Sequence, residues 1–228
     1  MTDDLRSDDG VPMHADRDVI ARRSPSARRR RFALLALTAL LAGCAALQPP
    51  KVEDQTLYVL AANPLPQAAG SRHDLVVEVA LPRAWPGFGT ARMAYVRRPY
   101  ELDYYAASRW ADTPARMLQP LVARALEQTR SFRSVVRAPG IVPADVRLDT
   151  EIVRLEQDFT VRPSRVEFTL RAQLVDVRER RVIATKVFDE VENAPHENAD
   201  GGVVAANDAL QRLLGRVADF CIAEAPSR

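Results

Sequence analysis

Apolar and polar residues alternate regularly through residues 165–177. Apolar side chains occupy every second position, at Val166, Phe168, Leu170, Ala172 and Leu174. Because successive side chains of a β-strand point to opposite faces of its sheet, this pattern predicts a strand with one buried and one solvated face. Such two-sided strands are typical of antiparallel sheets.

Further strands are predicted where short apolar or alternating runs end in proline, glycine or polar turns. They are residues 56–60, 74–81, 93–96, 101–105, 132–136, 145–160 and 181–191. The third and fourth are close enough in sequence to form a hairpin across Arg97, Arg98 and Pro99. In the longest run the alternation loses phase at Val153 and Leu155, which indicates a β-bulge.

A first amphipathic helix is predicted to open within residues 109–114. Asp112 or Thr113 would cap its free N–H groups, and Pro114 suits the first turn because it has no N–H to leave unpaired. Its apolar face recurs with helical spacing, at Met117, Leu118, Leu121, Val122, Ala125 and Leu126. Pro120 removes one helical hydrogen bond, so we expect a kink or a late start there.

A second helix is predicted at residues 203–223, after a polar, turn-rich loop at residues 193–202. Its apolar face consists of Val203, Ala206, Leu210, Leu213, Val217 and Phe220. The order of elements is strands, helix, strands, helix. This order predicts an α+β domain in which a curved, mostly antiparallel sheet carries two amphipathic helices on one side.

A basic and then apolar segment, residues 28–44, precedes the domain. Four arginines are followed by ten residues that are apolar except for Thr38, and the segment ends in Leu-Ala-Gly-Cys at residues 41–44. This order is typical of an export signal, and the apolar run is too short for a membrane span of roughly 20 residues. The last four residues fit the bacterial lipobox, so Cys44 is the predicted site of lipid attachment.

Two other interpretations use parts of the same segment. It would also suit a buried apolar helix with an incidental cysteine, and residues 29–32 resemble a twin-arginine signal, which leaves the export route open. The preceding residues 1–27 are acidic and long for a lipoprotein leader. We therefore expect translation to begin further along the chain, at Met13 or at an internal start that is not ATG.

The domain organisation follows from these limits. Residues 1–43 form the leader, residues 44–55 a lipidated tether and residues 56–225 one folded domain. Pro49 and Pro50 favour an extended chain in the tether. Acylation of Cys44 would leave Cys221 without a disulfide partner, and we expect Cys221 to be a small buried residue on the last helix.

Charge and chemistry narrow the function. The leader holds 8 basic and 6 acidic residues, and subtracting these from 32 and 30 leaves 24 of each in the mature chain. A neutral domain offers no electrostatic case for nucleic acid. The histidines, His14, His73 and His196, lie in no metal or catalytic motif. We therefore predict a protein that is not an enzyme and binds no metal or cofactor.

The acidic residues leave one enzymatic alternative open. A carboxylate pair would support hydrolysis of glycans or cell-wall material. The candidates Glu151, Glu156 and Asp158 instead follow strand alternation and predict a solvated sheet face.

Aromatic and basic residues crowd into residues 95–110. They are Tyr95, Tyr100, Tyr104, Tyr105 and Trp110, beside Arg97, Arg98 and Arg109. One interpretation is structural, with Tyr104 and Trp110 anchoring the first helix to the sheet. The other is a partner surface of Tyr104, Tyr105, Arg109 and Trp110, since tyrosine, tryptophan and arginine dominate interface hot spots. Both can hold if Tyr105 and Arg109 are more exposed than Trp110.

Residues 99–112 also carry a family resemblance. Their core, Glu-Leu-x-Tyr-Tyr-x-x-x-Arg-Trp-Ala at residues 101–111, followed by the amphipathic helix, resembles the ABC-type transport auxiliary lipoproteins. That family includes the paraquat-inducible protein C group, and the resemblance covers residues 57–220. Arg109 and Trp110 belong to the signature, which does not itself assign them a role.

The resemblance implies a partner rather than a reaction. Members work beside an ABC permease, its ATPase and a periplasmic MCE-domain protein, in systems that move phospholipids or other hydrophobic molecules between two membranes. It implies a docking subunit attached through Cys44 to the periplasmic face of the outer membrane, which Ala45 in place of an aspartate also favours. A homo-oligomeric ring would suit the ring-shaped MCE partners. The alternative is a lipoprotein that itself carries a lipid or other hydrophobic ligand between sheet and helices.

Overall fold

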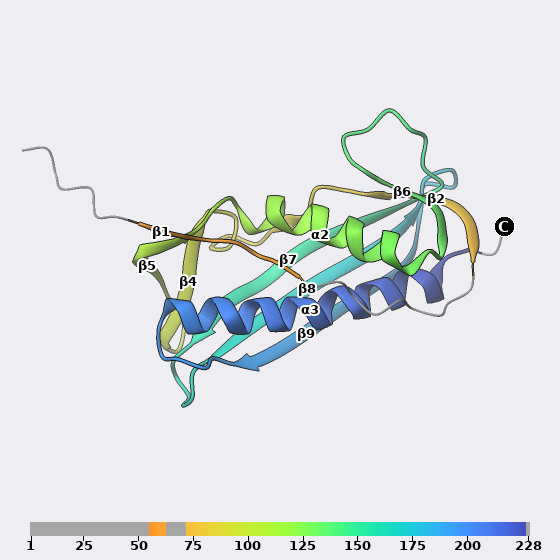
Figure 1. Cartoon of the computed structure of the whole chain (residues 1–228). Helices are drawn as coiled ribbons and strands as arrows, with labels where there is room; N and C mark the ends of the chain where they lie inside the picture. The colour runs from red at the N-terminus through yellow and green to blue at the C-terminus, as the bar shows by residue number, and fades with distance from the viewer. Residues whose placement is uncertain (1–54, 63–71, 227–228) are drawn as a thin grey trace, which may run out of the picture. The chain divides into compact units, whose positions relative to one another are not determined.

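The computed structural model describes residues 55–62 and 72–226. The chain divides into two units, Met1–Val52 and Glu53–Arg228, and all the described residues belong to the second. Within them, nine strands form one mixed sheet and two helices lie on the same face of it (Figure 1). The strands are β1 (Thr56–Tyr58), β2 (His73–Val79), β3 (Arg83–Ala84), β4 (Arg92–Arg98), β5 (Glu101–Trp110), β6 (Phe132–Arg137), β7 (Val146–Asp158), β8 (Arg165–Asp176) and β9 (Arg181–Asn193), and the helices are α2 (Pro114–Thr129) and α3 (Ala199–Glu224).

The sheet is organised around β7. Along one edge β7 pairs with the whole of β8 in antiparallel register, and β8 pairs in the same way with β9. Along its other edge β7 pairs in parallel with β2, then β3, then β4. β6 extends the sheet from β2, while β5 and then β1 extend it from β4. The predicted α+β fold is confirmed, and the short parallel pairs are a feature that the sequence pattern did not indicate.

The β-bulge predicted in β7 is confirmed. The pairing of β7 with β8 shifts register between Ile152 and Arg154, so Val153 is the extra residue. Ile152 and Leu155 are both buried on the helical side despite their odd spacing. The bulge therefore restores the phase of the buried positions along a long strand.

The first helix begins at Pro114, within the predicted range, but its side-chain cap and the residues before it differ from the prediction. Arg109 and Trp110 belong to β5, because the Trp110 N–H donates to the Ala91 carbonyl (2.8 Å) and β1 pairs along the other edge. Helix α2 begins at Pro114, and the Thr113 side chain accepts no capping hydrogen bond. The Asp112 carboxylate instead accepts from the Thr113 N–H (2.7 Å).

Helix α2 runs through Pro120, so the expected late start is wrong and the alternative, a kink there, stays a prediction. A proline in the second turn removes only one hydrogen bond from a helix that is held by packing. The predicted start of the last helix is corrected. Helix α3 begins at Ala199, inside the predicted loop. The Asn198 side chain caps it by accepting from the Gly201 N–H (2.9 Å).

The core lies between the helices and the sheet. Its fully buried residues come from both layers, with Phe168, Leu170 and Phe188 on the strands and Leu118 and Leu213 on the helices. Burying each such side chain is worth roughly 1.5–3 kcal/mol. None of the described helices is both long enough and apolar enough to cross a membrane.

Candidate functional site

The aromatic and basic residues singled out from the sequence lie on the β4–β5 hairpin. Pro99 and Tyr100 form its turn, and Arg98 binds Glu101 across it at 2.7 Å. Tyr100 adopts φ = 67°, in the left-handed region that non-glycine residues rarely occupy, and its side chain is fully exposed. The turn thus holds an aromatic side chain out in solvent.

Tyr104 and Tyr105 are successive residues of β5 and point to opposite faces of the sheet. The Tyr104 hydroxyl donates to the Gly87 carbonyl (3.1 Å), and the Arg92 guanidinium lies 3.6 Å from its ring centroid. Gly87 has φ = 99°, a conformation that glycine adopts without strain. Tyr104 therefore anchors the loop after β3, and does not join the first helix to the sheet as one interpretation expected.

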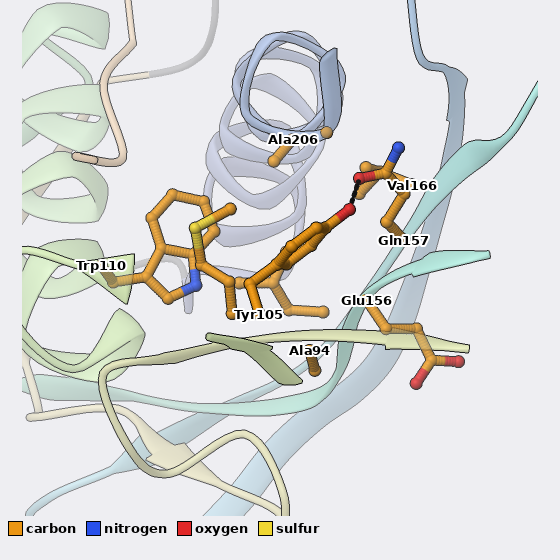
Figure 2. A pocket seen from close by; sticks show the side chains of 10 residues that line it. Ala94, Tyr105, Trp110, Glu156, Gln157, Val166 and Ala206 are labelled. Carbon is orange, nitrogen blue, oxygen red and sulfur yellow. Dashed lines mark hydrogen bonds between the residues drawn. The ribbon is translucent and has the colours of Figure 1, made fainter. Parts of the chain in front are cut away.

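Tyr105 faces the helical side and begins a buried chain of hydrogen bonds. Its hydroxyl donates to Gln157 Oε1 (2.8 Å) (Figure 2), and Gln157 Nε2 in turn donates to Ser164 Oγ (2.9 Å). The Ser164 N–H donates to the Glu197 carboxylate (2.7 Å). Burial raises the pKa of Tyr105, so the hydroxyl keeps its proton and remains a donor. The chain joins β5, β7, the start of β8 and the segment before α3.

Trp110 is part of the core and only 4% exposed. Beside it a cavity of about 20 Å³ opens between Tyr105 and Ala206, which is room for about one water molecule. Gly202 lets α3 approach this cluster, because a Cβ there would lie 2.1 Å from Gln157 Oε1.

Arg109 is the exposed member of the predicted partner surface. Its guanidinium donates a long hydrogen bond to Gln55 Oε1 (3.4 Å). Tyr105 is half-buried, so both are more exposed than Trp110, as expected. The structure does not bring Tyr104, Tyr105, Arg109 and Trp110 onto one open surface. Cys44, the predicted lipid attachment site, lies outside the described residues.

An open groove of about 390 Å³ lies on the sheet face opposite the helices. Its apolar lining is Trp85, Phe88, Val96, Tyr100, Leu102 and Val153, and its polar lining is Glu101, Arg154 and Glu156. The tryptophan is 51% exposed. Sequence periodicity did not indicate this site, because Trp-Pro-Gly-Phe at residues 85–88 follows neither strand nor helical spacing. The two aromatic residues flanking a turn were the available signal.

The three acidic candidates for acid–base chemistry are held by arginine. Glu151 lies 3.9 Å from Arg83, and Glu156 lies 3.7 Å from Arg154 and points away from the Tyr105 cluster (Figure 2). Burial raises the pKa of Glu156. The described residues contain no group of three or more histidine, cysteine or acidic side chains that would hold a metal ion.

Asp158 differs from the solvated position that strand alternation predicts. It is buried, and its carboxylate accepts from the N–H (2.8 Å) and hydroxyl (2.6 Å) of Thr160. Burial alone would raise the pKa of Asp158, but these hydrogen bonds and the nearby Arg165 outweigh it and lower the pKa. Asp158 is therefore an ionised structural group that holds the turn after β7.

Comparison with known proteins places this fold. A family model described as the ABC-type transport auxiliary lipoprotein component matches residues 58–218. A solved protein of Xanthomonas campestris assigned to the DUF330 family is 22% identical, with a TM-score of 0.68 over 74% of this chain and 96% of its own. A second solved structure, described as an uncharacterized protein, is 12% identical, with a TM-score of 0.59 over 74% of this chain and 99% of its own. At these identities the likeness shows the fold alone. No curated protein matches the chain.

Proposed function

The chain belongs to the family of ABC-type transport auxiliary lipoprotein components, and from that premise we propose that it is the docking subunit of an MCE-type lipid transport system. In this proposal, acyl chains on Cys44 hold the domain at the periplasmic face of the outer membrane. Each buried methylene contributes about 0.8 kcal/mol, so several chains anchor the protein stably. An MCE-domain protein, with its ABC permease and ATPase, would contact the domain from the periplasm.

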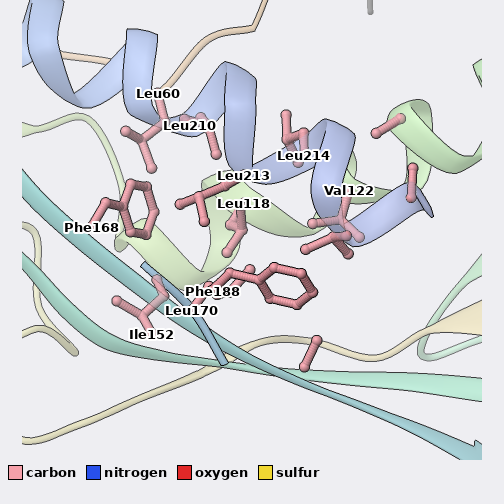
Figure 3. Close-up of a cluster of buried hydrophobic side chains, with 14 of the residues drawn as sticks. Leu60, Leu118, Val122, Ile152, Phe168, Leu170, Phe188, Leu210, Leu213 and Leu214 are labelled. Carbon is pink, nitrogen blue, oxygen red and sulfur yellow. The ribbon is translucent and has the colours of Figure 1, made fainter. Parts of the chain in front are cut away.

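The packing between the sheet and the helices favours a docking subunit over a lipid carrier. A carrier of the kind considered above would hold its ligand between the two layers. That space is filled by side chains that are almost completely buried, among them Phe168, Phe188, Leu210, Leu213 and Leu214 (Figure 3). The cavity beside Trp110 has room for a water molecule and not for an acyl chain.

The groove on the opposite face supports a docking role. It is apolar, it is open, and it presents the half-exposed Trp85 beside Leu102 and Arg154. Aromatic and arginine side chains of this kind carry most of the binding energy at protein interfaces. Tyr104 positions the groove by holding the loop that contains Gly87. In the proposal, the groove is the surface that receives the protein partner.

Affinity purification in mild detergent tests the proposal. The full chain with a C-terminal tag is recovered from its membranes, and proteins and lipids are both identified by mass spectrometry. We expect to recover an MCE-domain protein with a permease and an ATPase. We also expect less than one non-covalently bound lipid per chain, not counting the acyl chains on Cys44. Stoichiometric lipid without those proteins would overturn the docking role in favour of a carrier.

A pair of variants locates the surface. Trp85→Ala removes the exposed aromatic of the groove, and Val187→Ala changes a residue of β9 that is exposed to a similar extent, 49% against 51%. Trp85→Ala should lower recovery of the partner at least tenfold, since loss of a hot-spot residue costs about 2 kcal/mol or more. Val187→Ala should not change it. Equal recovery with both variants would place the docking surface elsewhere.

A further inference from the structure

Two turns lie side by side at one end of the sheet. β4 runs parallel to the last part of β7, with Val96 in register with Asp158, so both strands end there. The Phe159 N–H donates to the Val96 carbonyl (2.8 Å), and the Arg97 guanidinium lies 5.6 Å from the Phe159 ring centroid. We call residues 97–100 and 159–163 the paired turns.

The paired turns expose apolar side chains to solvent. Tyr100 is fully exposed, Val161 is 37% exposed, and Pro99 and Pro163 are also exposed. Tyrosine and aliphatic side chains at such positions cost free energy in water and favour the boundary between headgroups and acyl chains of a bilayer.

Two arginines of the paired turns make no ion pair with another described residue. The Arg97 guanidinium lies near the rings of Tyr95 and Phe159, and within residues 55–62 and 72–226 the Arg162 side chain forms neither a salt bridge nor a hydrogen bond. Of the acidic groups nearby, Glu101 is paired with Arg98 at 2.7 Å and Asp158 with Arg165 at 3.3 Å, while the Glu197 carboxylate accepts from the Ser164 N–H at 2.7 Å. The exposed guanidinium groups of Arg97 and Arg162 suit anionic lipid headgroups.

The turn at the opposite end of the sheet has a similar composition. Composition therefore does not show which end faces the membrane, and the position of the anchor has to decide. The β8–β9 turn, residues 177–180, carries an exposed valine, Val177, and Arg180 beside the start of β9. β8 spans 12 residues, so this turn lies about 40 Å from the paired turns.

The course of β1 favours the paired turns. β1 runs parallel to β5 with Thr56 opposite Ser108, so the chain enters β1 from the end at which β5 begins, beside the paired turns. Glu101, the first residue of β5, precedes Ser108 by seven residues, so Thr56 lies roughly 23 Å along the strand from the start of β5. Cys44 precedes Thr56 by 12 residues, and a chain of that length reaches at most about 40 Å. An anchor at Cys44 can therefore bring the paired turns to the membrane surface.

From these observations we propose that the paired turns contact the membrane that holds the lipid anchor, with Tyr100 and Val161 at the bilayer interface and Arg97 and Arg162 beside anionic headgroups. This inference rests on the proposed function in one respect, the acylation of Cys44. The contact adds little to the strength of the anchor. It fixes the orientation of the sheet, with the β8–β9 turn directed away from the membrane, which a tether alone would leave free.

Depth-dependent quenching tests the orientation with a matched pair of labelled proteins. Val161→Cys and Val177→Cys replace exposed valines, 37% and 39% exposed, in turns at opposite ends of the sheet. Cys221 is buried and Cys44 acylated, so an environment-sensitive dye labels only the new cysteine. The full acylated chain is placed in vesicles of three parts phosphatidylcholine and one part phosphatidylglycerol that contain a lipid nitroxide. Dye at residue 161 should be quenched and blue-shifted, whereas dye at residue 177 should behave as in water.

Charge variants test the role of the arginines. Arg97→Ser and Arg162→Ser should each lower the equilibrium constant for contact about fivefold on these vesicles, and much less on phosphatidylcholine alone. Arg180→Ser and Arg181→Ser, at the other end of the sheet, should leave the quenching at residue 161 unchanged. Equal quenching at residues 161 and 177, or stronger quenching at 177, would overturn the proposal.

Two outcomes separate this inference from the proposed function. Quenching at residue 161 without recovery of an MCE system in the purification would keep the membrane contact and remove the transport role. Recovery that is lost with Arg97→Ser and Arg162→Ser, with no quenching at residue 161, would assign the paired turns to the protein partner instead. Absence of acyl groups on Cys44 by mass spectrometry would overturn both.

Discussion

Gly201 and Gly202 lie where a side chain would not fit. A Cβ on Gly201 would lie 2.1 Å from the His196 carbonyl oxygen, and one on Gly202 would meet Gln157 at the same distance. Because both glycines follow a polar segment, their sequence predicted a loop. In the structure they lie in the first turn of α3, where Gly201 leaves room for the backbone of His196 and Gly202 lets the helix lie against Gln157 of β7.

A substitution pair in α3 separates this steric role from helix propensity. Gly201→Ala should destabilise the domain by about 1–3 kcal/mol, because rigid backbone of His196 occupies the space of the new methyl group. Gly215→Ala in the same helix meets nothing within 4 Å and should stabilise it by about 1 kcal/mol. Urea unfolding of both variants measures the difference, and effects of the same sign would refute the assignment.

The Tyr105 hydroxyl gives a second prediction for a single residue. Tyr105→Phe leaves the buried Gln157 Oε1 without its donor and should cost about 1–3 kcal/mol of unfolding free energy. Tyr100→Phe removes a hydroxyl that is fully in solvent and should change stability by less than about 0.5 kcal/mol. Thermal unfolding distinguishes the two. A Tyr105→Phe protein as stable as the parent would mean that water replaces the lost donor.

At the scale of elements, Glu190 fastens α3 to the edge of the sheet. It lies on β9, and its carboxylate accepts from Arg212 (2.7 Å) and Arg216 (2.6 Å), which lie one turn apart on the helix. Burial alone would raise the pKa of Glu190, but the hydrogen bonds from both arginines outweigh it and lower the pKa from its ordinary value of 4.5. The ionised form is therefore preferred in the folded state.

This link predicts a pH dependence of stability. A carboxylate whose pKa is lowered on folding stabilises the fold above its unfolded pKa of 4.5, and the contribution is lost as pH falls through the lower folded value. The parent should therefore lose more stability than Glu190→Gln between pH 6 and pH 3. Urea unfolding of both proteins at each pH gives the comparison, and parallel losses would show that other carboxylates account for the acid sensitivity.

Element boundaries show where sequence reasoning reached its limit. Alternation located β8 and the bulge in β7, because each residue's burial follows from its own position in a regular strand. It ended β5 five residues early, since Arg109 and Trp110 are kept in the strand by β1, which lies about 50 residues away in sequence. Local periodicity carries no information about such a distant partner.

At the scale of the whole molecule, Cys221 reports on global unfolding. The prediction that it is buried on the last helix is confirmed, and burial raises the pKa of its thiol to about 12. We therefore expect a thiol reagent at pH 8 to leave the folded protein unmodified and to react as fast as the domain unfolds. The rate should rise with urea in parallel with the unfolding rate, whereas rapid reaction without denaturant would require local opening of α3.

The sequence by itself determined the class of fold and the family. Periodicity reports which side of each element meets water, and the hydrophobic effect then requires a sheet with two helices on one face. The resemblance carried by residues 99–112 correctly indicated the family. The lipid attachment at Cys44 and the partner role of Arg109 stay predictions.

Only the tertiary structure decided which residues meet. It buried Trp110, brought Tyr104 to Gly87 and Tyr105 to Gln157, and assembled the groove and the paired turns from strands that are distant in sequence. The parallel pairing of β7 with β2, β3 and β4 brings those strands together. The physical reason is that strand pairing is a choice among partners of similar local pattern, and it is settled by the packing of the whole core rather than by any one segment.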